Sequence, residues 1–199
     1  MRILIVGASG TIGQAVVAAL QPRHEVILAS RGKSPEKVEL TDVNSIRALY
    51  KRVGRIDAVV SVAGEAAYKP LTQLRDEDFA FSVGSKLMGQ VNLVRLGIDN
   101  VADEGSFTLS SGILATRPTP GGAAISMVNA GLDAFARAAA LELPRKIRIN
   151  SVSPPWVAET LTAMGRDPSG GLPASDVARS YVESVEGKQT GAVITPKRR

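Results

Sequence analysis

The chain alternates short, nearly continuous apolar runs with longer segments whose apolar positions recur at helical spacing. Uninterrupted apolar runs are typical of parallel strands covered on both faces, whereas an amphipathic helix keeps one polar face. The apolar runs predict seven strands, at residues 2–7, 25–30, 37–41, 56–62, 106–110, 147–152 and 191–195. The helical patterns predict five helices, at residues 11–20, 43–52, 76 to about 100, 124–143 and 175–185.

Strands that alternate with helices predict an α/β fold, a doubly wound parallel sheet with helices on both faces. The chain has 199 residues, of which 44% are hydrophobic and 22% charged, so we expect one domain spanning residues 1–199. Pro144 should end the fourth helix, and Ser175 or Asp176 should cap the start of the fifth. Residues 166–173, rich in glycine and proline, are interpreted as a surface loop. In this architecture ligands bind at the carboxyl ends of the strands.

The composition removes several kinds of chemistry. Cysteine is absent and His24 is the sole histidine, so we expect no disulfide, no thiolate nucleophile and no metal site. His24 precedes the second strand, at the wrong end of the sheet for catalysis, and is interpreted as a turn residue.

The charge and the hydropathy pattern bear on partners and location. The net charge of +5 is scattered and aromatic residues are 4% of the chain, so we expect no nucleic-acid partner. No apolar run approaches the roughly 18 residues of a membrane span. The short apolar run after Arg2 ends in glycines rather than a cleavage site, so a cytoplasmic location is expected.

A glycine-rich turn follows the first strand and leads directly into a helix. Its glycines allow the backbone to approach a pyrophosphate closely, and the free N–H groups at the helix start then face the anion. The spacing is G-x-x-G-x-x-G rather than the more familiar G-x-G-x-x-G. This predicts a dinucleotide-binding site of the Rossmann type, with candidate residues Gly7, Ser9, Gly10, Thr11, Ile12 and Gly13.

The end of the second strand carries the signal for the type of coenzyme. A site for NAD usually places an acidic residue here, whereas this chain has Ser30 and Arg31. A guanidinium can hold a 2′-phosphate with its forked donors, and the serine adds a hydroxyl. We therefore expect NADP(H) to be favoured over NAD(H). The alternative is that Arg31 is an ordinary solvated residue.

Taken in order, these segments resemble the short-chain dehydrogenase/reductase family almost from end to end. The glycine turn resembles the family's coenzyme loop, and Ser110-Ser111-Gly112 resembles the segment that carries its catalytic serine. The resemblance implies a coenzyme site that also includes Asp42, Val43, Ala63, Gly64 and Pro154. Asp42 is expected to contact the adenine amino group, and Pro154 lies in the segment beside the nicotinamide.

The chain departs from the family where the chemistry is expected. Reductases of this family use asparagine, serine, tyrosine and lysine, with tyrosine as the proton donor. Here Ser111 matches, but Ile125 stands at the tyrosine position, Asn129 at the lysine position and Lys86 at the asparagine position. We therefore take Ser111, Lys86 and Asn129 as the candidate catalytic residues.

These replacements leave roles open. Lys86 and Asn129 are interpreted as having exchanged places across one cleft. Three roles are then open to Lys86: a proton donor with a lowered pKa, a contact for the coenzyme ribose, or a structural cation. One hypothesis is an NADP(H)-dependent oxidoreductase acting on a small carbonyl or alcohol, with water or Lys86 giving the proton. The other is a catalytically inactive dinucleotide-binding protein with a regulatory or redox-sensing role.

The remaining expectations concern the pocket and the assembly. Tyr68 is interpreted as a loop residue, Tyr50 and Tyr181 as packing residues, and Trp156 as a candidate wall of the substrate pocket beside Thr160. Residues 116–122, with two prolines and two glycines, are expected to shape its mouth. The helix at residues 124–143 is apolar on more than one face, which together with the resemblance favours a homodimer or homotetramer.

Overall fold

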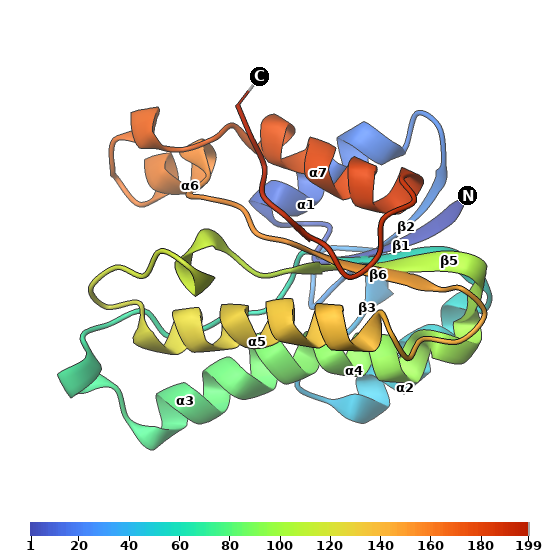
Figure 1. Ribbon diagram of the computed structural model, residues 1–199, viewed down its shortest axis with the longest axis horizontal. Helices are drawn as coiled ribbons and strands as arrows, with labels where there is room; N and C mark the ends of the chain where they lie inside the picture. The colour runs from blue at the N-terminus through green and yellow to red at the C-terminus, as the bar shows by residue number, and fades with distance from the viewer. Residues whose placement is uncertain (199) are drawn as a thin grey trace.

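A computed structural model describes residues 1–198 and contains one seven-stranded parallel sheet with the strand order β3-β2-β1-β4-β5-β6-β7 (Figure 1). The strands are β1 (Arg2–Val6), β2 (Glu25–Ser30), β3 (Glu36–Lys37), β4 (Ile56–Ser61), β5 (Val101–Ser110), β6 (Arg148–Val152) and β7 (Val193–Ile194). The order reverses direction between β1 and β4, which is where doubly wound sheets bind ligands. This confirms the predicted fold class.

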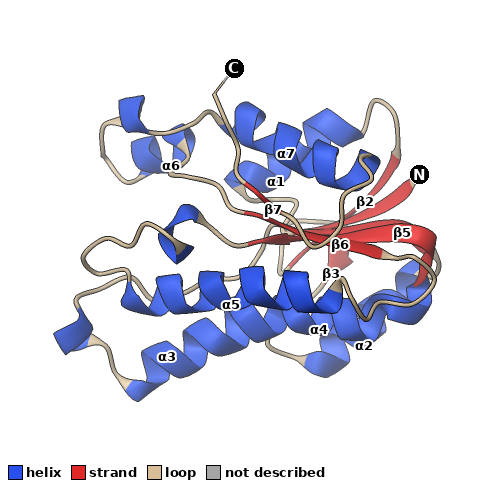
Figure 2. Cartoon of the chain, viewed as in Figure 1, coloured by secondary structure: helices blue, strands red, loops and turns tan. Residues whose placement is uncertain are grey.

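Helices cover both faces of the sheet (Figures 1 and 2). One layer consists of α1 (Thr11–Leu20), α6 (Ala158–Ala163) and α7 (Ala174–Glu186). The other consists of α2 (Val43–Val53), α3 (Asp76–Ser82), α4 (Gly89–Gly97) and α5 (Ala123–Ala139). Along β1 the side chains alternate, with Ile3 and Ile5 in the core beneath α1 and α7, and Leu4 and Val6 in the opposite core. Burial on both sides explains why the strand reads as an unbroken apolar run.

The predicted helix from Asp76 to about Asn100 is continuous but changes its winding. A π-helical segment, η2 (Val83–Met88), joins α3 to α4, and a short 3₁₀ turn, η3 (Ile98–Asn100), ends it. Periodicity alone did not predict the π-helical turn. Such turns are often found at functional sites, and this one carries Lys86.

Several elements differ from the sequence predictions, among them β5, which begins at Val101 rather than at residue 106. β3 begins at Glu36 and ends at Lys37, and Val38 and Leu40 beyond it pack into the core from an irregular segment. α5 ends at Ala139, before the expected stop at Pro144. α6, which was not predicted, occupies residues before the glycine-rich loop.

The start of α7 was predicted wrongly. Neither Ser175 nor Asp176 caps this helix; it begins at Ala174, whose backbone N–H donates to the Glu159 carboxylate of α6 at 2.9 Å and 3.0 Å. Asp176 instead accepts a hydrogen bond from Arg179. A carboxylate from another helix satisfies the free donor, which no local sequence pattern reveals.

The position of His24 and the lengths of the helices can be compared with the sequence predictions. His24 lies in the turn before β2 and contacts the Glu186 carboxylate at 2.8 Å, as expected for a turn residue. Within residues 1–198, no helix has both the length and the apolar character needed to cross a bilayer.

Candidate functional site

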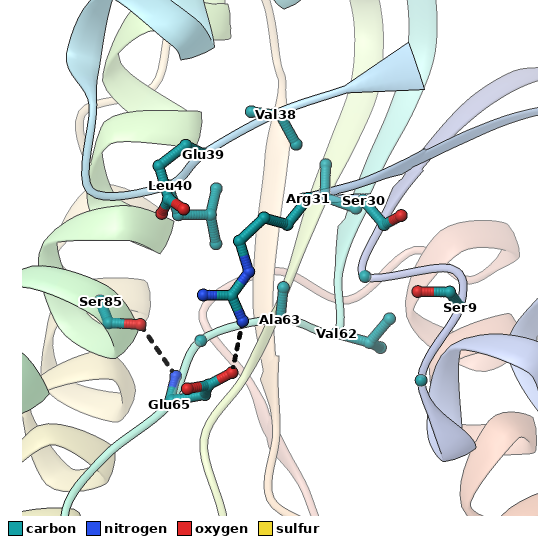
Figure 3. Close-up of a pocket in the computed structure, with 14 residues that line it drawn as sticks. Ser9, Ser30, Arg31, Val38, Glu39, Leu40, Val62, Ala63, Glu65 and Ser85 are labelled. Carbon is teal, nitrogen blue, oxygen red and sulfur yellow. Dashed lines mark hydrogen bonds and ion pairs between the residues drawn. The ribbon is translucent and has the colours of Figure 1, made fainter. Parts of the chain in front are cut away.

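The principal cavity opens at the carboxyl ends of β1, β2 and β4 and has a volume of about 280 Å³ (Figure 3). The loops that follow these strands supply its walls, together with the segment after β3 and Ser85 of η2. Its lining residues are Val6, Gly7, Ser9, Gly10, Ser30, Arg31, Val38, Glu39, Leu40, Val62, Ala63, Gly64, Glu65 and Ser85. The predicted site residues Gly7, Ser9, Gly10, Ser30, Arg31, Ala63 and Gly64 are therefore brought together.

The glycine turn fits tightly against the sheet. Gly7 has φ +90°, and a Cβ on it would lie 2.7 Å from the carbonyl carbon of Val62. A Cβ on Gly13 would lie 2.1 Å from the carbonyl oxygen of Gly7. Gly13 therefore packs directly against the backbone of the turn, with no room for a side chain. Neither Gly13 nor Thr11 lines the cavity.

The amino end of α1 has the properties of an anion site. Gly10 is its N-cap and provides no side-chain acceptor, and the first turn contains no acidic residue. The first N–H groups of this helix thus have no capping side chain, next to a cavity lined by Gly7, Ser9 and Gly10. A phosphate or pyrophosphate group is the chemistry that such an end accepts.

Ser30 and Arg31 both line the cavity, but neither is free. The Ser30 Oγ accepts hydrogen bonds from the backbone N–H groups of Lys33 and Ser34, which holds the loop after β2. Arg31 Nη2 lies 2.9 Å from Glu65 Oε1 (Figure 3). No acidic residue follows β2 directly in the sequence, yet Glu65 and Glu39 line the same cavity from the segments after β4 and β3.

Asp42 and Val43, expected from the resemblance to contact the coenzyme, are not among the residues that line the cavity. The Asp42 carboxylate accepts a hydrogen bond from the backbone N–H of Asn44 at 2.8 Å and caps α2, whose first residue is Val43. Glu39 and Leu40 line the cavity in their place. Backbone and side-chain hydrogen bonds from Thr41 hold the pKa of Glu39 below its usual value, with a smaller contribution from Arg31.

A second cavity of about 150 Å³ lies where the loops after β5 and β6 meet the start of α5. Ser111 and Ile125 line it together, so the structure places the residue at the tyrosine position beside the serine. Pro154 and Ile12 also line it, and both were predicted as coenzyme contacts. The other lining residues are Gly112, Ile113, Leu114, Pro155, Trp156, Val157 and Thr160.

Lys86 and Asn129 line neither cavity, but each lies against a glycine that lines one of them. A Cβ on Gly64 would lie 2.8 Å from the Cα of Lys86, so Lys86 adjoins the wall of the principal cavity. Asn129 is 2% exposed, and a Cβ on Gly112 would lie 2.9 Å from its Nδ2, directly behind the Ser111–Gly112 turn. The Oδ1 atom of Asn129 is buried and has no hydrogen-bond partner among residues 1–198.

Asp133 is a member of this cluster that the sequence argument missed. It lies one helical turn after Asn129 on α5, is buried, and accepts a hydrogen bond from the Ser151 Oγ at 2.7 Å. Burial lowers the pKa of Lys86 to about 8, and the nearby charge of Asp133 partly opposes that effect. The i, i+4 spacing of Asn129 and Asp133 was the signal available in the sequence.

The lowered pKa of Lys86 predicts a rise in stability with pH. Between about pH 8 and pH 10 the unfolded chain binds more protons than the folded one, so the free energy of unfolding should increase by about 1–2 kcal/mol. Denaturant unfolding measured across this range tests the prediction. The range stops at pH 10 because burial raises the pKa values of Tyr50 and Tyr181, which lowers stability above that point.

Two variants separate Lys86 from the other titrating groups. Lys86→Met should remove the rise, whereas Lys51→Met, at an exposed position on α2, should retain it. A rise that persists in Lys86→Met would contradict the assignment.

The tyrosines have the surroundings expected of them. The Tyr50 hydroxyl donates to the Leu93 carbonyl oxygen, and the Tyr181 hydroxyl is 2.6 Å from the Ser110 Oγ, so both are packing residues. Tyr68 lies in the loop after β4 and contacts the edge of Trp156, with ring centroids 6.1 Å apart. Pro120 and Gly121 line an outer groove with Tyr68 rather than the cavity around Ser111, so the expected role of residues 116–122 is confined to that outer surface.

Comparison with known proteins assigns the class of this chain. A family model described as enoyl-(acyl carrier protein) reductase matches residues 12–192. The chain therefore belongs to the short-chain dehydrogenase/reductase family.

Individual relatives agree with this class. A hydroxynaphthalene reductase from Aspergillus fumigatus is 30% identical over 156 residues, which are 76% of this chain and 55% of that protein, so the chain spans about half of its length. The crystal structure of protein lin1944 from Listeria innocua is 45% identical, with a TM-score of 0.95 over 98% of both chains. A small-chain dehydrogenase in complex with NADPH shares the fold at 24% identity, with a TM-score of 0.87 over 98% of this chain and 95% of that one.

The residues present fit the nicotinamide dinucleotide that this family binds. The uncapped end of α1 over the glycine turn suits a pyrophosphate, and Arg31 suits a 2′-phosphate. The buried, unpartnered Oδ1 of Asn129 can accept a hydrogen bond from a hydroxyl or a water. Ile12, two residues after Gly10 of the principal cavity, lines the second cavity together with Ser111.

Proposed function

We propose that this protein is an NADP(H)-dependent oxidoreductase that transfers a hydride between the coenzyme and a small carbonyl or alcohol substrate. One observation carries the proposal: a cavity at the uncapped start of α1 and a second cavity that contains the Ser111 hydroxyl open at the same edge of the sheet. When bound, the coenzyme supplies the hydride. Residues 1–199 act as one coenzyme-binding domain.

Each candidate residue has a distinct role in this proposal. Ser111 donates a hydrogen bond to the substrate oxygen and orients it. Asn129 accepts a hydrogen bond from the coenzyme ribose or from a water behind the Ser111–Gly112 turn. Lys86, held between the Gly64 loop and the Asp133 carboxylate, stabilises the coenzyme side of the cluster, and the proton comes from water or from Lys86.

A second function remains in competition because Ile125 occupies the cavity beside Ser111. Isoleucine has no proton to donate, so the same architecture also suits an inactive dinucleotide-binding protein that senses coenzyme or regulates a partner. The two functions share the coenzyme site and differ only in turnover.

Coenzyme titration followed by an activity assay tests both functions. NADPH should bind with an increase in its own fluorescence, and NADPH consumption should depend on a carbonyl substrate. Ser111→Ala should leave coenzyme affinity unchanged and lower kcat/KM about a hundredfold, because it removes a donor to the developing oxyanion. Tight NADPH binding without turnover over a broad panel of aldehydes, ketones and quinones would favour the sensing role.

We further propose a homo-oligomer that pairs through the layer of α3, η2 and α5. Phe81, Met88 and Met127 expose large apolar side chains on these elements, at 46%, 39% and 44%. α3 and α5 lie side by side in the lower layer of Figure 1. Light scattering at micromolar concentration that gave a monomer mass would contradict this proposal.

A further inference from the structure

The cavity around Ser111 offers hydrogen-bond donors but no effective acid. Most of its lining is aliphatic, and its polar side chains are the hydroxyls of Ser111 and Thr160 and the indole of Trp156. None of these groups gives up a proton readily near neutral pH. Reduction of an ordinary ketone produces an alkoxide, which needs a proton as it forms.

A quinone places a smaller demand on the site. Hydride transfer to a quinone produces the monoanion of a hydroquinone, which is a phenolate of the kind that tyrosine forms with a pKa of about 10. That anion is far less basic than an alkoxide and can leave without receiving a proton from the protein. A hydrogen bond from Ser111 is then sufficient stabilisation.

The outer wall of the cavity suits a flat ring. Trp156 lines it, the Tyr68 ring meets the Trp156 ring at 81°, and the Arg166 guanidinium lies 5.2 Å from the centre of the Trp156 ring. Aromatic walls of this kind favour offset or edge contacts with planar aromatic ligands.

We propose that the substrate is a quinone whose carbonyl lies against Ser111 and whose ring packs beside Trp156. This inference rests on the proposed function. The C4–H bond of the reduced nicotinamide breaks, and its hydride forms an O–H bond at the quinone oxygen remote from Ser111. The electron pair passes through the ring to the oxygen beside Ser111, which becomes the phenolate of the hydroquinone monoanion and takes one proton from water. Atoms and charge balance without a protein acid.

A matched pair of bicyclic substrates tests the substrate class. Under anaerobic conditions kcat/KM for 1,4-naphthoquinone should exceed that for 1-tetralone by about a hundredfold or more, because only the ketone needs a general acid within the cavity, which Lys86 does not line. Ser111→Ala should reduce naphthoquinone turnover strongly. Equal turnover of the two compounds, or turnover of the ketone alone, would overturn the inference, as would NADPH binding with neither turned over. Absence of NADPH binding would overturn the proposed function as well.

A separate observation concerns the mouth of the principal cavity. Arg31 reaches from the loop after β2 to Glu65 in the loop after β4, with the guanidinium passing near Ala63 (Figure 3). Both side chains are mostly exposed, at 71% and 61%. The ion pair therefore spans the opening of the cavity.

The position of Glu65 is fixed by its own backbone. Its N–H donates to the Ser85 Oγ of η2 at 3.0 Å, which keeps the carboxylate facing Arg31 (Figure 3). Glu39 lines the same cavity and also attracts Arg31. The cation that would hold a 2′-phosphate is thus already engaged by protein carboxylates.

We infer that Glu65 is a specificity-determining residue that competes with the 2′-phosphate for Arg31. NADPH must displace Glu65 and tolerate its charge, whereas NADH has only a hydroxyl at that position. Glu65 therefore reduces the preference for NADPH over NADH. This inference also rests on the proposed function.

Glu65→Gln tests the competition while retaining the size of the side chain. The dissociation constant of NADPH should fall about fivefold or more, as expected for releasing an exposed ion pair and removing a like charge, and that of NADH should change less than twofold. Glu36→Gln is the matched control, because it breaks the exposed ion pair of Glu36 with Arg52 outside the cavity. Fluorescence titration with both coenzymes gives the ratio of the NADPH and NADH dissociation constants.

Two results would overturn the assignment to Glu65. If both coenzymes bind and Glu65→Gln leaves their ratio unchanged, this inference alone fails. If neither coenzyme binds the unmodified protein, the proposed function fails and takes this inference with it.

Discussion

Replacing Gly13 with alanine should abolish measurable coenzyme binding and lower the free energy of unfolding by about 3 kcal/mol. The added Cβ would lie 2.1 Å from the carbonyl oxygen of Gly7 and 2.9 Å from the Cα of Ala8. Both atoms belong to the backbone of the glycine turn, so the turn itself must move. Denaturant unfolding and NADPH titration measure the two effects.

Two other glycines provide controls for this result. A Cβ on Gly10 would meet only the Gly7 oxygen, at an ordinary 3.5 Å, so Gly10→Ala should fold normally and still lose at least about tenfold in NADPH affinity. A Cβ on Gly170 would have nothing within 4 Å, so Gly170→Ala should affect neither property. Full NADPH affinity in Gly13→Ala would refute the role of the turn.

Restoring the missing acid should convert the protein into a ketone reductase. The combined variant Ile125→Tyr, Asn129→Lys and Lys86→Asn places a phenol in the cavity beside Ser111 and a lysine one turn away on α5. We expect kcat/KM for 1-tetralone to rise by about a hundredfold or more, because a positioned general acid contributes at least that factor. NADPH absorbance measures the rate.

The matched control is the same variant with Ile125→Phe, which adds the ring without the hydroxyl. The phenylalanine variant should bind NADPH as tightly as the tyrosine variant does and leave the ketone unreduced. If the tyrosine variant folds and binds NADPH but gains no ketone activity over the phenylalanine variant, residue 125 does not face the reacting carbonyl.

The fold was predictable because β1 and β4, the central strands at the site, are buried on both faces. Apolar runs mark β1, β2 and β4, and helical spacing of apolar residues marks α1, so few other assignments of secondary structure were possible. The glycine turn lies where the first strand meets the first helix. Ile125 lines the same cavity as Ser111, although fourteen positions separate the two in the sequence.

The acidic residues of the cavity were not predictable by the same route. Asp42 precedes a helix, where a carboxylate can cap or bind a ligand, and the sequence does not distinguish these roles; the structure shows that it caps α2. Glu65 and Arg31 are 34 positions apart and meet only because β1 lies between β2 and β4 in the sheet. Contacts set by strand order need the tertiary structure.

Trp156 is the only tryptophan in the chain, and it lies in the wall of the second cavity. Intrinsic emission excited beyond the tyrosine band therefore arises at a single point, next to the site where a ligand would enter. A library of unlabelled compounds can be screened by the change in that emission alone, before any reaction is known and whether or not turnover follows.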